Sequence, residues 1–151
     1  GAIVHTAGIQ FPATQVANAG ANVLDDYEEG QFDGVLESST GDNETQTNSG
    51  KYTKIGNMVC FSVHLSNIDN GITMAGDITL TGLPFTSANL TACAMHINYQ
   101  ADTKFFNARI TNATTTMEFY QRDVTSADGV EMTDSTIGDY TDITVSGTYL
   151  I

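Results

Sequence analysis

Three histidines, His5, His64 and His96, are the first candidates for acid–base chemistry in this sequence. His64 and His96 alternate with apolar residues in strand-like stretches, which favours packed or interface side chains over catalytic bases. A serine hydrolase needs a serine, a histidine and an acid held together, and the sequence has no Gly-x-Ser-x-Gly turn. A glycosidase needs two carboxyl groups about 5 to 9.5 Å apart, which the spacing of the acids does not predict. We therefore expect no enzymatic activity.

The two cysteines and an acid-rich stretch at 122–142 are the candidates for metal binding. Cys60 and Cys93 have neither Cys-x-x-Cys spacing nor histidine neighbours, which predicts free, buried thiols and no zinc site. The acid-rich stretch lacks the Asp-x-Asp-x-Asp-Gly spacing of a calcium loop, so a solvated loop is favoured over calcium held by looser oxygen ligation. We assign no metal and expect no cofactor. The acids of this stretch are Asp123, Asp128, Glu131, Asp134, Asp139 and Asp142.

Aromatic and amide side chains around a predicted hairpin tip at 100–103 are the candidates for ligand binding. Recognition residues are often found at such tips. Aromatic rings beside amide and cationic groups suit contact with a sugar, although at least half of the aromatic residues in this part of the chain must serve the core. The candidate ligand-binding residues are Tyr99, Lys104, Phe105, Asn107 and Arg109.

The composition of the chain limits the kinds of partner that it can bind. At 151 residues the chain is long enough for one domain with its own core. Eighteen acids against five bases give a net charge of −13, which argues against nucleic acids and anionic membranes as partners. No apolar run reaches the ~20 residues of a membrane span, and the first 20 residues have no signal-peptide pattern, so no membrane insertion is expected. The polar residues are mostly Thr, Asn, Ser and Gln, which suit either sugar contact or an ordinary sandwich exterior.

Alternation of apolar and polar residues predicts an all-β protein with about eight strands. The pattern is interrupted by Gly, Asn and Asp, and no helical period is present. We therefore expect an antiparallel, jelly-roll-like β-sandwich over residues 25–151, with loops at 38–49, 66–76 and 122–141 and an extended connector at 1–24. The predicted strands are 31–37, 50–55, 57–66, 77–83, 90–99, 105–111, 115–121 and 142–150.

Two features predict that copies of the chain associate. The strand at 57–66 carries apolar or weakly polar residues on both faces, which predicts that it either lies centrally in a sandwich or faces another copy of the chain. The acids around Tyr27 (Asp25, Asp26, Glu28 and Glu29) are too dense to share the core of a single chain. We expect an interface between copies that includes Tyr27, Met58, Cys60 and His64.

Four short stretches are distinctive as strings: IQFPATQ at 9–15, NVLDDYEEG at 22–30, YTKIGNMV at 52–59 and GLPF at 82–85. Their order and spacing resemble a recurrent module of bacteriophage tail fibre and tailspike proteins over roughly residues 9 to 88. After Asn89 only the strand pattern is similar. The family usually follows its acidic stretch with Gly-Thr-Trp-Thr-Pro, whereas this chain has GQFDG at 30–34 and no tryptophan. Phe32 can replace the tryptophan as a packing residue.

The resemblance implies the distal, C-terminal domain of a fibre or spike, located on the virion and joined to an upstream shaft. It implies a homotrimer, and the threefold symmetry of phage fibres supplies a closed assembly. Two functions are consistent with it: binding of a host cell-surface receptor, a glycan or a protein, or purely structural trimerisation and capping of the shaft without a ligand. None of the motifs implies catalysis.

Overall fold

The computed structural model describes residues 26–41, 48–66, 68, 74–98, 104–123, 125, 128–133 and 142–151. These residues form nine β-strands and no helix, and every pairing is antiparallel. The all-β, antiparallel class is therefore confirmed. The predicted connector at 1–24 lies outside these residues and stays a prediction. The strands are β1 (Tyr27–Gly41), β2 (Asn48–Ile55), β3 (Met58–Leu65), β4 (Met74–Thr81), β5 (Thr91–Asn98), β6 (Lys104–Ile110), β7 (Met117–Asp123), β8 (Val130–Glu131) and β9 (Asp142–Leu150).

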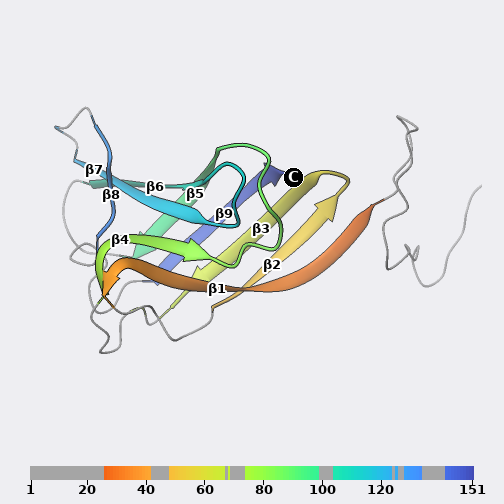
Figure 1. Ribbon diagram of the computed structural model, residues 1–151, viewed down its shortest axis with the longest axis horizontal. Coiled ribbons are helices and arrows are strands. Elements are labelled where there is room, and N and C mark those ends of the chain that lie inside the picture. The colour runs from red at the N-terminus through yellow and green to blue at the C-terminus, as the bar shows by residue number, and fades with distance from the viewer. Residues whose placement is uncertain are drawn as a thin grey trace, which may run out of the picture.

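Eight of these strands close into a barrel (Figure 1). Their hydrogen-bonded order is β4-β1-β2-β3-β9-β5-β6-β7, and β7 pairs back with β4. Two strands pass from one half of the barrel to the other: β1 pairs first with β2 and then with β4, and β5 pairs first with β6 and then with β9. The sequence favoured a sandwich of two separate sheets. The structure instead joins them, because β1 and β5 are shared and β4 meets β7.

The short strand β8 lies where β4 and β7 diverge. It pairs with β7 at 120–121, and the N–H of Met132 donates to the carbonyl of Phe119 at 2.8 Å. On the other side, the carbonyl of Met132 accepts the N–H of Ile78 at 2.9 Å. The side chain of Met132 is fully buried between them. The prediction of an irregular loop over 122–141 is therefore wrong for these residues, since a two-residue strand has too little alternation to be recognised.

The core fills the barrel, and β3 shows how alternation builds it. Its inner residues are buried: Val59, Phe61, Val63 and Leu65. The Phe61 ring packs edge-on against Tyr149, with the two centroids 5.9 Å apart. The outward residues of β3, from Met58 to His64, are exposed. The expectation that both faces of this strand are covered is thus wrong for a single copy, because the barrel covers only the inner face.

The two cysteines lie on opposite sides of the barrel wall. Both thiols are free, as predicted, but only Cys93 is buried, whereas Cys60 is exposed. Cys60 faces outward because it lies between two inward residues of β3, and its sulfur is 3.3 Å from the hydroxyl of Thr148. The prediction of a buried thiol is therefore wrong for Cys60.

A two-residue turn at Gly56–Asn57 joins β2 to β3, as the sequence predicts. Gly56 has a φ of 58°, in the left-handed region that a residue without a Cβ adopts most easily. Glycine at the first central position with positive φ is typical of hairpin turns that match strand twist. This turn fixes the register of β3, so Met58, Cys60, Ser62 and His64 all point outward.

Candidate functional site

Residues from three of the motif stretches meet at one end of the barrel. Asp26 and Lys54 form an ion pair, and both are buried, whereas the other charged side chains that the structure describes are at least partly exposed. The Lys54 ammonium also lies 5.6 Å from the centroid of the Phe85 ring. The carbonyl of Asp26 accepts the N–H of Gly56 at 2.8 Å, which ties the start of β1 to the β2–β3 turn. One acid of the acidic stretch therefore does share the core of a single chain, contrary to expectation, because a lysine is buried with it.

Two tyrosines complete this end cluster, which we define as Asp26, Tyr52, Lys54, Phe85 and Tyr149. The Tyr52 ring meets Phe85 edge-on at 5.3 Å between centroids. A hydrogen bond to Glu28 and burial raise the pKa of Tyr52 to about 12. The Tyr149 hydroxyl donates to the carbonyl of Phe85 at 3.1 Å and accepts its N–H at 3.3 Å. The end cluster is thus a packing arrangement that closes the barrel end, and its members are engaged with one another.

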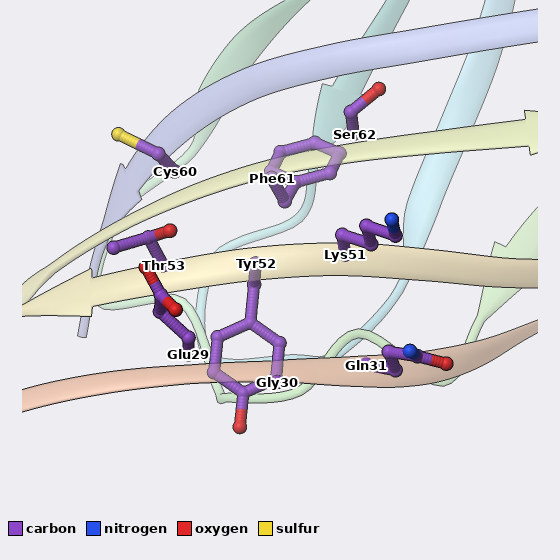
Figure 2. Close-up of a pocket in the computed structure, with 9 residues that line it drawn as sticks. All are labelled: Glu29, Gly30, Gln31, Lys51, Tyr52, Thr53, Cys60, Phe61 and Ser62. Atoms are coloured by element: carbon purple, nitrogen blue, oxygen red, sulfur yellow. The ribbon is translucent and has the colours of Figure 1, made fainter.

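A shallow groove crosses β1, β2 and β3 on the outside of the barrel, with a volume of about 610 Å³. Figure 2 shows three consecutive residues from each strand around it. The middle residues (Gly30, Tyr52 and Phe61) are cross-strand partners. The flanking residues form two polar rows: Glu29, Thr53 and Cys60 on one side, and Gln31, Lys51 and Ser62 on the other. The groove offers hydroxyl, amide and charged groups without an exposed aromatic ring.

The groove continues across β3 into a larger surface with few charges, which the exposed acids Glu29 and Asp33 border on β1. Among its residues Lys51 is the one base and Asp142 the one acid, and Asp142 lies 4.0 Å from His64 at one end. The surface is otherwise made of hydroxyl, thiol, amide, imidazole and apolar side chains. We call it the neutral face and define it as Ser49, Lys51, Thr53 and Ile55 of β2, Met58, Cys60, Ser62 and His64 of β3, Asp142, Thr144, Ser146, Thr148 and Leu150 of β9, and Ala94, His96 and Asn98 of β5.

One edge of the neutral face is apolar. Ile55, Met58 and Leu150 follow one another across β2, β3 and β9 in register, and they are 40%, 37% and 43% exposed. Tyr27 of β1 extends the row as the partner of Ile55. We call these four residues the apolar row. The structure thus brings together all four predicted interface residues on one outer surface, because Cys60 and His64 follow Met58 on the same side of β3.

A second surface, on β6 and β7, collects the predicted ligand-binding residues. Phe105, Asn107 and Arg109 alternate along β6 and point outward, and Phe105 is 60% exposed. The guanidinium of Arg122 lies 5.7 Å from the centroid of the Phe105 ring. Of the other two predicted residues, Lys104 begins β6, whereas Tyr99 falls outside the residues that the structure describes. Arg122 was missed in the sequence because its proximity depends on the β6–β7 register.

Arg109 is held in a polar network on this surface. Its guanidinium makes a 2.8 Å ion pair with Glu118 and lies 4.5 Å from the centroid of the Tyr120 ring. The Tyr120 hydroxyl lies 2.8 Å from Glu118 and 3.1 Å from Glu131, but it has one proton to donate. Burial acts to raise the pKa of Glu118, yet hydrogen bonds from Tyr120 and Arg109 lower it overall. Burial, and then the nearby Asp77, raise the pKa of Glu131.

This network determines which side chains of the β6–β7 surface are available to a ligand. Arg109 is engaged with Glu118 and Tyr120, so its role here is to hold the surface in shape. Phe105, Asn107 and Arg122 are exposed, and they present a ring, an amide and a guanidinium on one side of the barrel. Among the described residues, no three histidine, cysteine or acidic side chains are arranged to hold a metal ion.

Comparison with known proteins gives no relative: no protein family, curated protein or solved structure matches this chain. In the part of the chain that the structure describes, no helix has the length and hydrophobicity needed to cross a membrane.

Proposed function

We propose that this chain is the distal domain of a bacteriophage tail fibre or tailspike, which assembles as a homotrimer on the virion and binds a glycan on the host cell. The observation that carries the binding proposal is the β6–β7 surface, where Phe105, Asn107 and Arg122 lie exposed together. An exposed ring can stack on the C–H face of a sugar while the amide and guanidinium bond its hydroxyl groups. The resemblance of residues 9 to 88 to a tail fibre and tailspike module supports the assignment to a phage fibre or spike.

The charge of the chain supports a neutral ligand. A net charge of −13 opposes binding of nucleic acid or of an anionic polymer at most of the surface. At the β6–β7 surface the acids Glu118 and Glu131 are turned towards Arg109 and Tyr120, while Phe105 and Arg122 remain exposed. A glycan that offers hydroxyl groups, with or without an acidic substituent beside Arg122, fits this arrangement.

Glycan-array binding by the purified protein tests the proposal. Phe105→Ala is expected to weaken binding of a selected glycan about tenfold, the value of one stacked ring or cation–π contact. Phe105→Tyr keeps the ring and should bind like the wild type. Leu90→Ala is the matched control, since Leu90 is 56% exposed but lies outside the β6–β7 surface. Equal binding by Phe105→Ala and the wild type would contradict the site.

A second candidate is a purely structural domain that trimerises and caps a fibre shaft without a ligand. The end cluster favours it, because the motif residues Asp26, Lys54 and Phe85 contact one another inside the barrel and present no binding surface. A trimer that binds neither the array nor host cells would support this candidate over the first.

A further inference from the structure

We infer that the neutral face is the surface on which copies of this chain meet. The inference rests on the proposed function, which requires three copies but does not say which surface joins them. The occupant of the neutral face is therefore a second copy of the same chain. In a closed trimer, three such faces directed at one axis would each touch both neighbours.

Charge is the first argument for this face. Two copies with a net charge of −13 each repel one another wherever carboxylates come opposite carboxylates. The other outer surface contains more charges of both signs: the acids Glu37, Asp77, Glu118 and Glu131, and the bases Arg109 and Arg122, of which Arg109 is paired with Glu118. On the neutral face the only acid is Asp142, and the exposed acids Glu29 and Asp33 border it on the β1 side, so two copies that meet over β3, β9 and β5 bring few carboxylates together.

The apolar row is the second argument. Ile55, Met58 and Leu150 are large, adjacent across three strands and each more than one-third exposed. Contiguous exposed apolar side chains favour association, because contact removes them from water. The row borders the neutral face along the strand ends, so one contact would cover both surfaces.

Hydroxyl groups make the neutral face complementary to itself. Ser62 pairs with Ser146, and Cys60 with Thr148, across β3 and β9. A hydroxyl both donates and accepts a hydrogen bond, so it can bond an identical group on another copy. These side chains are also short, which allows the strands of two copies to come close. The partner therefore does not have to be one that only donates or only accepts hydrogen bonds.

The strand β5 supplies a matched pair of variants. Ala92 and Ala94 are both exposed and point outward, but Ala94 is the partner of Ser146 on the neutral face, while Ala92 is the partner of Arg109 on the other surface. Each is changed to glutamate, and the mass in solution is measured by light scattering. The wild type is expected near three times the 16.1 kDa of one chain.

We expect Ala94→Glu to weaken association at least about tenfold, because it places like charges against one another in the contact. Ala92→Glu should assemble like the wild type. Ser62→Glu, in the middle of β3, is a second variant in case Ala94→Glu does not fold. Circular dichroism and thermal unfolding check the folding of each variant before its mass is interpreted.

A measurement on the unmodified protein gives an independent test. Cys60 lies exposed on the neutral face of one copy, whereas Cys93 is buried inside the barrel and serves as an internal control. The rate at which a thiol reagent labels Cys60 should fall several-fold as protein concentration drives assembly. Slow labelling of Cys93 at every concentration confirms that the barrel stays folded.

The outcomes separate this inference from the proposed function. If the wild type assembles but Ala94→Glu and Ser62→Glu assemble equally well, with Cys60 labelled at a constant rate, the neutral face is not the contact and a trimer through another surface remains. If the wild type is a single chain at high concentration, the inference and the trimer both fail. Glycan binding through Phe105 is measured separately and can succeed in either case.

Discussion

The buried ion pair between Asp26 and Lys54 can be tested by removing the charge of Asp26 and measuring the change in stability. Asp26→Asn keeps the shape of the side chain and removes its charge, so the Lys54 ammonium would remain buried without an anion. The two side chains are only 9% and 8% exposed, which leaves little access for water to replace the lost partner. The chain becomes less negative in this variant, so relief of general repulsion acts in the stabilising direction.

The expected cost follows from this burial. Removal of one partner from a buried ion pair typically costs about 3–5 kcal/mol. The Phe85 ring, 5.6 Å from the Lys54 ammonium, contacts it in both proteins, so this contact does not change the difference. We therefore expect Asp26→Asn to lower the free energy of unfolding by about 3–5 kcal/mol. Replacing both residues with apolar ones, as in Asp26→Leu with Lys54→Met, should cost much less than either change alone.

Urea unfolding at one fixed protein concentration measures these changes, because urea leaves ionic strength unchanged and association depends on concentration. Asp26→Asn, Lys54→Met and the two together form a double-mutant cycle that isolates the interaction between the two side chains. Glu29→Gln is the control, since it removes an exposed acid of the same stretch and is expected to change stability by less than about 0.5 kcal/mol. A loss under about 1 kcal/mol for Asp26→Asn would mean that the pair behaves like a surface bridge, and the reasoning from burial would be wrong.

Three further predictions concern the rest of the barrel. Gly82→Ala should destabilise the protein by more than about 2 kcal/mol, because φ is 90° and the new Cβ would overlap the Asp33 carbonyl, whereas Gly56→Ala at φ 58° meets nothing and should cost about 1 kcal/mol in the same urea assay. Tyr149→Phe should cost about 1–3 kcal/mol, since it leaves the Phe85 N–H and carbonyl without the hydroxyl; a loss near zero would show that these bonds are replaced by water. Burial raises the pKa of Cys93 from 9.0 to about 11, so the stability that the neutral thiol contributes is present below pH 9 and falls by about 2–3 kcal/mol towards pH 11. Cys93→Ala should therefore make the free energy of unfolding depend less steeply on pH between 9 and 11. An unchanged slope would contradict this prediction.

Eight of the nine strands were predictable in part because their alternation is local, although β1 and β2 extend into the predicted loop at 38–49. On β9, Ile143, Val145 and Tyr149 are buried as the period of two indicates, and on β6 the same rule places Phe105 and Asn107 together on the outside. The β2–β3 turn was predictable for the same reason, since the pair Gly56–Asn57 between two alternating stretches is typical of a two-residue hairpin turn. These features need no information from distant parts of the chain.

The features that sequence reasoning missed depend on distant residues. The burial of Asp26 requires Lys54, which comes from another strand, so a dense acidic stretch reads as exposed when it is considered alone. Closure of the barrel requires β4 to meet β7 at Thr79–Glu118, a pairing that no turn between them imposes. The position of Arg122 over Phe105 likewise follows from the β6–β7 register.

The motif residues and the proposed binding surface fall in different parts of the barrel, which bears on where specificity can vary. The module resemblance ends near Asn89, and its residues Asp26, Lys54 and Phe85 are committed to the end cluster. The segment after Asn89 cannot change as a whole, because it supplies β5, β6, β7 and β9, which are four of the eight barrel strands. The outward positions of β6 and β7 are free of both constraints, since neither the end cluster nor the neutral face includes them. Under the proposed function, a change of ligand is expected to proceed through Phe105 and Arg122 while the barrel and the inferred contact between copies are kept.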